Sequence, residues 1–429
     1  MRSLVVRLGF TMMRRAMSSL TKADIERQRL GGMAEGSFAL SQQFNKDSRP
    51  GDNAWHIGGV GSAGQGDPIQ PSQVLLASMQ KAVMEPHLIL PYSADPTGEP
   101  GPKEAASMYL QSMFPDRKKM DPESIILPTS VKATIGLVVR AHSDIDWAIP
   151  SVGYSSYSEV FDNVNEVTGL YKYKIDKDRH LRLNLDQIRV MVEENGIRGL
   201  ILNPSGSNPG GWVMNQDEKT FLDNLQKQYP DLVVLEERIY DFAVDRDKLE
   251  IGPLASSILS VESHKQLGAS GLRGPGLIVA PSEASYDAIS RQHNMGNSHC
   301  PTFQQLVMER VWRDWASEGE DYERVEEQRE VFRQRRTLVS KILGDIMTHS
   351  PEGGLCIQIN IPKGQSGKSF SEKAKQEGFW LSGGSAFRYG QSESKLDSFL
   401  RLTIGKVGGT DQFAEELARF REFWFQCDV

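Results

Sequence analysis

The fold of this chain is decided by residues 199–240, GLILNPSGSNPGGWVMNQDEKTFLDNLQKQYPDLVVLEERIY. The stretch contains two short apolar runs, Gly199–Leu202 and Leu232–Leu235. Between them lie a loop rich in Asn, Pro and Gly and then Asn215–Tyr229, which has the apolar spacing of a helix. Short buried strands that alternate with helices are typical of a mostly parallel, doubly wound sheet. Ligands in such sheets bind at the carboxyl ends of the strands, so the residues just after each run are the candidates for function.

The same alternation continues on both sides of this stretch. Helical spacing or a short apolar run occurs at Gln73–Val83, Lys103–Phe114, Ser124–Leu127, Trp147–Pro150, Ile258–Val261 and Gly276–Val279. Past Arg310, residues Glu318–Ile346 form one long charged helical pattern. Shorter helical and strand-like segments follow it at Gly354–Ile361, Phe370–Gly378, near Trp380, at Phe399–Thr403 and at Gln412–Trp424. We therefore expect an N-terminal arm over 23–70, a large α/β domain over 71–315 and a smaller α/β domain over 316–429.

Composition excludes several classes of protein. The 429 residues carry 49 Lys and Arg against 56 Asp and Glu, a net charge of −7, which makes non-specific nucleic-acid binding unexpected. No run of about 18 uncharged apolar residues occurs, so no membrane span is expected. Three widely separated cysteines exclude a disulfide scaffold, offer no pair at zinc spacing and suggest a reducing compartment.

The first 22 residues differ from the rest. The first twenty contain four arginines, and no acid precedes Asp24, which is the composition of a mitochondrial transit peptide. A disordered tail or a start assigned too far upstream remains an alternative. We expect a mitochondrial protein if the segment is a targeting sequence and a cytoplasmic one otherwise.

A lysine in a glycine-rich setting is the first candidate for chemistry. Lys265 lies in SVESHKQLGASGLRGPG (260–276), just after an apolar run. A lone lysine is ordinarily a solvated surface charge. Here glycines allow the backbone to approach a ligand closely, and Arg273 is suited to bidentate contact with a phosphate. This context favours an anionic ligand beside Lys265.

Three further segments place polar residues next to apolar runs. VVLEERIYDF (233–242) ends its run with two glutamates, which either belong to a site or face solvent at the strand end. Ser130 precedes a helix in ILPTSVKATIGL (126–137), and amides at a helix N-terminus can hold phosphate. Arg401 lies inside the apolar run FLRLTIG (399–405), where burial is costly unless the charge is paired. A salt bridge to another segment would satisfy it as well as a ligand would.

Taken in order, these segments resemble the fold-type I pyridoxal-phosphate (PLP) aminotransferases from about Gly58 to the C-terminus. The resemblance implies the aspartate aminotransferase-like fold, a PLP cofactor held by Lys265 as a Schiff base, and a site at the interface of a homodimer. The layout of PEGGLCIQI (351–359) and FLRLTIG is closest to the branch that contains valine–pyruvate aminotransferase.

The resemblance also implies a role for individual residues. Asn208 and Tyr240 match the residues that bond the phenolic oxygen of the cofactor, and Glu237 takes the position of the aspartate at the pyridine nitrogen. Arg401 matches the arginine that binds the α-carboxylate of the substrate. The remaining matches are Ser130, Val131, Lys132 and Arg273 at the phosphate, Tyr154 stacked on the ring, Tyr92 reaching the partner subunit's phosphate, and Gly59 in the glycine-rich segment that lines the substrate site. For Tyr154, a core position is the ordinary alternative.

Several positions depart from the family pattern. Glu237 replaces an aspartate, Glu262 replaces a serine that contacts phosphate, His264 replaces a small residue, and Gly276 falls one position late. We expect an aminotransferase that moves an amino group between an α-amino acid and a 2-oxo acid. The clustered changes keep open a PLP-dependent lyase, synthase or carbon–carbon bond-forming enzyme, and also a PLP-binding protein with little catalytic activity.

Overall fold

The structure is a computed structural model. It describes residues 46–47, 72–91, 93, 95–115, 117, 120–164, 167–268, 274–296, 299–389, 399–405 and 409–428. Three of the expected site residues, Gly59, Tyr92 and Arg273, lie outside the described residues, as do the expected targeting segment and nearly all of the arm.

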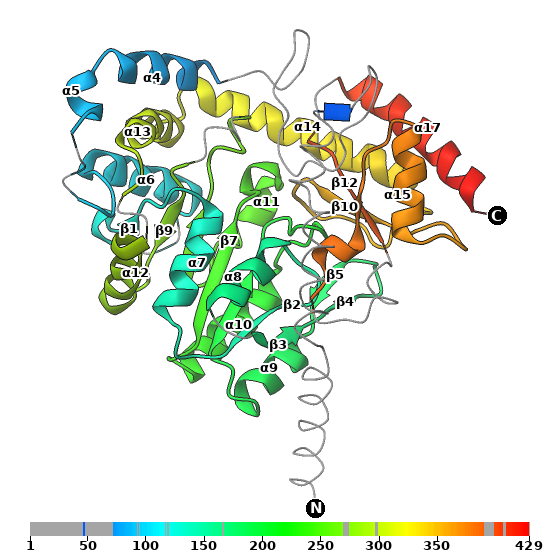
Figure 1. Ribbon diagram of the computed structural model, residues 1–429, viewed down its shortest axis with the longest axis horizontal. Helices are drawn as coiled ribbons and strands as arrows, with labels where there is room; N and C mark the ends of the chain where they lie inside the picture. Colours follow the sequence, from blue (N-terminus) through cyan, green and yellow to red (C-terminus); the bar gives the residue numbers. More distant parts are fainter. Residues whose placement is uncertain are drawn as a thin grey trace, which may run out of the picture.

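A mixed sheet forms the centre of the molecule (Figure 1). In the described part of the chain it has seven strands in the order β1-β9-β8-β7-β6-β2-β3. Neighbours from β8 to β3 are parallel, whereas β9 is antiparallel to both β8 and β1. The strands are Ile125–Ile126 (β1), Trp147–Pro150 (β2), Val167–Tyr171 (β3), Gly199–Leu202 (β6), Val233–Arg238 (β7), Ile258–Val261 (β8) and Leu277–Val279 (β9). The expectation of a mostly parallel, doubly wound sheet is confirmed.

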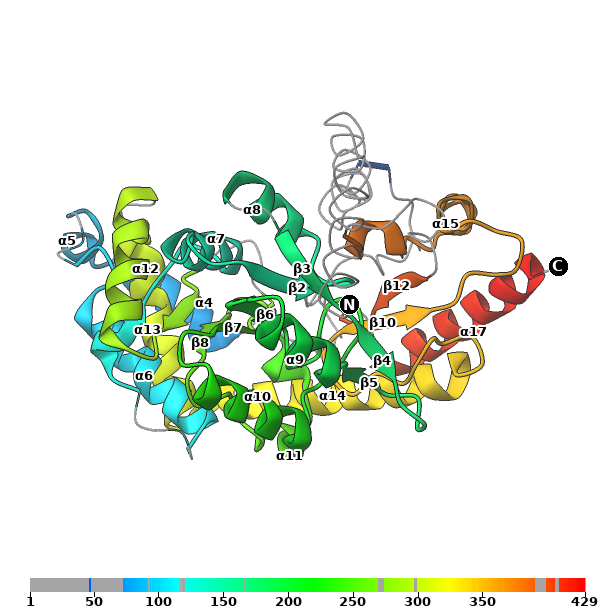
Figure 2. The same ribbon diagram turned by 90° about the horizontal axis from the view of Figure 1, so that it is seen from below.

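Helices cover both faces of this sheet, and Figure 2 shows the layers edge-on. One face carries α7 (Val131–Ala141), α8 (Ser156–Val164) and α12 (Glu283–Gly296), and the other carries α9 (Leu185–Glu193) and α10 (Gln216–Gln228). The N-terminus of α10 is fixed by a capping box, in which the Asn215 side chain and the Glu218 side chain each accept from the other's backbone N–H. Strands β2, β6 and β7 contribute apolar side chains to a cluster with the helices on each face of the sheet.

A group of helices packs beyond β1. It comprises α4 (Gln73–Val83), α5 (Pro86–Ile89), α6 (Pro100–Met113) and α13 (Thr302–Ala316). From there α14 (Glu320–Leu343) runs across the molecule towards the second sheet (Figure 1). The expected boundary between residues 315 and 316 falls at the end of α13, and the division into domains stays a prediction.

The second sheet is antiparallel, with the order β10-β12-β11. It consists of Cys356–Ile359 (β10), Ser382–Gly383 (β11) and Leu400–Thr403 (β12), and α15 (Gly367–Gln376) and α17 (Thr410–Cys427) complete this part. Side chains alternate across a strand, and Ile357, Ile359, Leu400 and Leu402 join the apolar core with α14 and α17. The opposite face carries Cys356, Gln358, Arg401 and Thr403.

The remaining elements are short. They are the hairpin of β4 (Tyr173–Ile175) and β5 (Leu181–Leu183), helix α11 (Arg246–Leu249), and single 3₁₀ turns at Pro122–Ser124, Asp241–Ala243 and Gly384–Phe387. Among the described residues, no helix is both long and apolar enough to cross a membrane.

Candidate active site

Lys265 and Tyr240 meet at the carboxyl edge of the main sheet. Lys265 follows β8, and Tyr240 follows β7, which lies next to it. The Lys265 Nζ donates to the Tyr240 hydroxyl at 3.3 Å and lies 4.8 Å from the centre of its ring. Burial raises the pKa of Tyr240 to about 12, although Lys265 and Arg401 lower it. Burial disfavours the charge of Lys265, but Tyr240 and Glu262 favour it more strongly and raise the pKa of the amine.

The two glutamates at the end of β7 point to opposite faces of the sheet. Glu236 is fully buried and accepts from the Leu254 backbone N–H at 2.7 Å and from Ser257. Glu237, only 1% exposed, accepts on Oε2 from the hydroxyl of Tyr157 in α8. Burial raises the pKa of Glu237 to about 7, against the lowering effects of Tyr157 and Lys265. The alternative that both acids face solvent is therefore wrong.

Arg401 and Asn208 join the second sheet to the main one. Arg401 is fully buried on β12, and its Nη1 donates to the Asn208 Oδ1 at 2.9 Å. Asn208 lies in the loop after β6, whose parallel neighbour is β7. The guanidinium of Arg401 also donates to the Ser382 hydroxyl at 3.3 Å and lies 4.7 Å from the centre of the Phe387 ring. A charge whose desolvation is costly is thus held in a fixed orientation at the site.

The start of α7 lies against the chain that follows Lys265. Ser130 caps the helix by accepting from the Ala133 N–H at 3.1 Å. Gly274 has a φ of +120°, and a Cβ at this position would lie 2.5 Å from the carbonyl oxygen of Thr129. Only glycine permits that approach, which places Gly274 against the residue just before Ser130, the N-cap of α7. The first amides of an α-helix have no partner within the helix, so the N-terminus of α7 is suited to an anion.

The structure is similar to solved aminotransferases. An archaeal alanine:glyoxylate aminotransferase matches with a TM-score of 0.71 and 18% identity, over 92% of this chain and 95% of that one. An aromatic aminotransferase from Pyrococcus horikoshii OT3 gives 0.72 and 19%, over 90% and 99%. A tyrosine aminotransferase from Leishmania infantum gives 0.70 and 16%, over 91% and 95%. The chain has the aminotransferase fold. No protein-family model and no curated protein matches the sequence.

Identities this low show the fold alone, so the activity has to be argued from the side chains. None of the three relatives tests the valine–pyruvate branch, which stays a prediction.

Some expected residues lie away from this cluster or make other contacts. Lys132 is exposed, and its amine pairs with Glu159 of α8. Tyr154 is half-buried, and its ring packs edge-on against Tyr157 at 5.8 Å between centres. Beside Lys265, Glu262 and His264 are both buried and pair with each other, so the acid that replaces the family's serine is directed to a histidine.

Residues that sequence reasoning missed complete the cluster. Tyr157 holds Glu237, Ser382 contacts Arg401, and the Cys356 Sγ lies 3.5 Å from the Asn208 Oδ1. No sequence pattern marks these residues. Tyr157 is one of several aromatic residues in its segment, and the other two lie in short strands. Among the described residues, no group of His, Cys, Asp and Glu could hold a metal ion.

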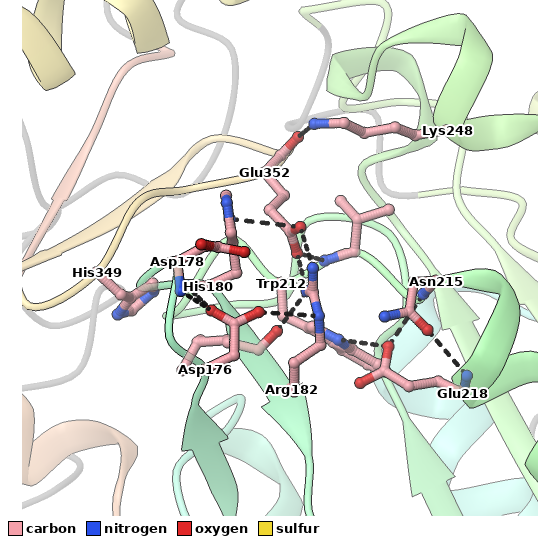
Figure 3. A network of polar contacts seen from close by, with 12 residues as sticks. Asp176, Asp178, His180, Arg182, Trp212, Asn215, Glu218, Lys248, His349 and Glu352 are labelled. Carbon is pink, nitrogen blue, oxygen red and sulfur yellow. Dashed lines mark hydrogen bonds and ion pairs between the residues drawn. The ribbon is translucent and has the colours of Figure 1, made fainter.

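The loop that carries Asn208 is fastened by a polar network, shown in Figure 3. Arg182 of β5 makes two hydrogen bonds to Glu352, at 2.7 and 2.9 Å, and Lys248 donates to the backbone oxygen of Glu352 at 2.7 Å. The buried His349 donates through Nε2 to the carbonyl oxygen of Gly210 at 2.6 Å. The segment leading into β10 is thereby attached to the loop after β6, two residues beyond Asn208.

Proposed function

We propose that the protein is a PLP-dependent aminotransferase that moves an amino group between an α-amino acid and a 2-oxo acid. The observation that carries the proposal is the Lys265–Tyr240 hydrogen bond of 3.3 Å, with Glu237 and Arg401 in the same cluster. These residues come from separate segments of the chain: Lys265 follows β8, Tyr240 and Glu237 lie at the end of β7 or just after it, and Arg401 lies on β12 of the second sheet.

The side chains present fit PLP. One oxygen of Glu237, Oε1, is buried with no hydrogen-bond partner among the described residues, a costly state that a protonated ring nitrogen would relieve. Tyr240 and Asn208 offer an O–H and an amide N–H, which suit a phenolic oxygen. Ser130, Val131 and Lys132 begin a helix whose terminus suits the phosphate. Arg273 is proposed for the phosphate, Tyr154 for the ring face, Tyr92 for the partner subunit's phosphate and Gly59 for the substrate.

Each polar residue has a distinct task in this proposal. Bound PLP supplies an electron sink that stabilises negative charge on the α-carbon of the substrate. Lys265 would hold the cofactor, and its amine would be placed to take the α-proton of the substrate as general base. Tyr240 accepts a hydrogen bond from the Lys265 nitrogen, and Glu237 would keep a proton on the ring nitrogen. Arg401 binds the α-carboxylate through its planar fork and thereby sets which α-bond is aligned for cleavage.

The experiment begins with the cofactor. Protein purified with PLP should show a visible absorption band, which Lys265→Ala removes and Lys227→Ala, at an exposed lysine on α10, leaves unchanged. Amino acids are then added singly, and mass spectrometry identifies the products. Transamination predicts a 2-oxo acid and pyridoxamine phosphate in equal amounts. Ammonia, carbon dioxide or a condensation product with unchanged PLP would favour the lyase or synthase alternative, and a band with no turnover would favour a binding protein.

The homodimer is also a proposal. Tyr92 can serve a partner subunit only if two copies associate around a two-fold axis. Light scattering behind size-exclusion chromatography should therefore give twice the 47.9 kDa of one chain. Because the site would be shared, dilution to the monomer should lower activity and cofactor binding together.

A further inference from the structure

Two donors converge on one oxygen atom in the site. The Asn208 Oδ1 accepts from the Arg401 Nη1 at 2.9 Å and from the Cys356 Sγ at 3.5 Å. All three side chains are buried. Arg401 is already explained as a ligand for a carboxylate, whereas the thiol has no part in the proposed reaction.

The second sheet accounts for the approach of the thiol to the amide. Arg401 lies on β12 opposite Gln358, and Cys356 lies two residues before Gln358 on β10. Side chains two apart on a strand share a face, so the thiol and the guanidinium both point away from the core of this sheet. That face lies towards the loop after β6, which carries Asn208.

The number of donors decides which way the amide faces. A carbonyl oxygen has two lone pairs, so the Asn208 Oδ1 can accept from both donors at once. Turning the amide over would place its N–H groups against the guanidinium, which has no acceptor, and would leave the thiol only as a weak acceptor. The orientation that directs the amide nitrogen away from Arg401 is therefore preferred.

We propose that Cys356 is a positioning residue, whose S–H donates to the Asn208 Oδ1 and, together with Arg401, offers the Asn208 Nδ2 to the phenolic oxygen of the cofactor. The inference rests on the proposed function. Burial raises the pKa of the thiol, although Arg401 and Lys265 lower it, so Cys356 stays protonated and can donate at neutral pH.

The test uses two substitutions of nearly equal size. Cys356→Ala removes the donor, and Cys356→Ser keeps one. The amide of Asn208 and the protonated Lys265 nitrogen would compete as donors for the phenolic oxygen of the cofactor. A hydrogen bond from Asn208 would therefore weaken the hold on the proton of the Lys265 nitrogen. Loosening Asn208 should therefore raise the pH midpoint of the visible band by roughly half a unit in Cys356→Ala, the size expected for one weak hydrogen bond. Cys356→Ser should restore the wild-type midpoint.

A double-mutant cycle isolates the route through Asn208. Asn208→Ala should raise the midpoint further than Cys356→Ala does, and adding Cys356→Ala to it should cause no additional shift. An unchanged midpoint in Cys356→Ala, an equal shift in the Ala and Ser variants, or full additivity in the cycle would each overturn the inference. Melting temperatures within a few degrees of wild type show that the variants fold.

A cofactor-free measurement separates this inference from the proposed function. The infrared S–H stretching band of Cys356, assigned by its loss in Cys356→Ala, should lie at the position of a donating thiol and move to that of a free thiol in Asn208→Ala. If the band moves but the protein never binds PLP, the hydrogen bond stands and the proposed function fails. If the band already lies at the free-thiol position in the wild type, the inference fails whatever the enzyme does.

Discussion

Tyr157 donates its phenolic hydrogen bond to Glu237, and the two residues come from different layers of the molecule. Tyr157 lies on α8 and Glu237 at the end of β7. The bond occupies one carboxylate oxygen, and the other has no partner among the described residues. Glu237 takes the position where the family pattern has the shorter aspartate. Tyr157 fixes its carboxylate through one oxygen and leaves the other oxygen for a ligand.

The buried carboxyl predicts a pH-dependent stability of the cofactor-free protein. Burial raises the pKa of Glu237 from 4.5 to about 7, so the folded state binds this proton more tightly than the unfolded state. The stability it contributes is fully present below pH 4.5 and is lost as the pH rises through 7, by roughly 3 kcal/mol in total. Glu237→Gln should lose this dependence in urea unfolding at pH 5 and pH 8. The exposed Glu330→Gln serves as the control and should keep the wild-type difference.

Tyr157→Phe tests the same carboxyl by changing the pKa of Glu237 while the glutamate itself is kept. The Tyr157 hydrogen bond lowers the pKa of Glu237, so its loss should raise that pKa further and move the fall in stability to higher pH. A variant curve that coincides with the wild-type curve would contradict the contact between the two side chains.

Much of the fold could be predicted because its strands are short, apolar and bounded by turns. Trp147–Pro150, Gly199–Leu202 and Ile258–Val261 are strands over the predicted residues. In contrast, β7 continues three residues past Leu235, because its charged end is buried and paired: Glu236 accepts from Ser257, and Glu237 accepts from Tyr157. A hydrophobic pattern cannot detect a strand whose last residues are charged and satisfied by neighbours remote in the sequence.

The site could be predicted only where a residue has a fixed place in a motif. Lys265 and Tyr240 each follow an apolar run, and their contact follows from the order of the strands. Tyr157 and Cys356 could not be predicted, because their roles depend on which side chains a helix and a strand direct towards one point. Lys132 has a place in a motif, but the motif does not reveal that its amine pairs with Glu159.

Arg401 predicts a carboxylate-specific loss of activity. Arg401→Lys keeps the charge but loses the planar fork, and should lower kcat/KM about 10- to 100-fold, mainly through KM. Arg401→Ala also leaves buried partners unsatisfied and should cost about 100-fold or more. Steady-state kinetics with an amino acid and with the matching amine separate carboxylate binding from maintenance of the fold. The amine has no carboxylate, so its turnover should not depend on the contact with Arg401. Equal losses for both donors would indicate that Arg401 only maintains the fold.

The Arg182–Glu352 pair predicts a larger effect on stability than an exposed pair. Its side chains are 20% and 12% exposed, and Glu352 also accepts from the Val213 N–H at 3.4 Å. We expect Arg182→Ala to cost about 1–2 kcal/mol in free energy of unfolding, measured in urea. Arg333→Ala breaks the exposed pair with Glu330 on α14 and should cost less than Arg182→Ala, because solvent screens the two charges. Similar costs for the two variants would show that the network in Figure 3 adds no more than a surface contact.

Lys132 separates two ways of holding a phosphate. If its amine binds the phosphate, Lys132→Ala should weaken PLP binding at least tenfold, and added salt should reduce the difference. The contact with Glu159 and the exposure of the side chain favour the backbone of the first turn of α7 as the binding group instead. We therefore expect Lys132→Ala to change the dissociation constant of PLP about twofold or less, measured by fluorescence titration. Glu159→Ala is the matched control, because it removes the partner of the lysine. If PLP binds more tightly to Glu159→Ala, and this gain disappears in the double variant with Lys132→Ala, the amine can reach the phosphate and is held back by Glu159.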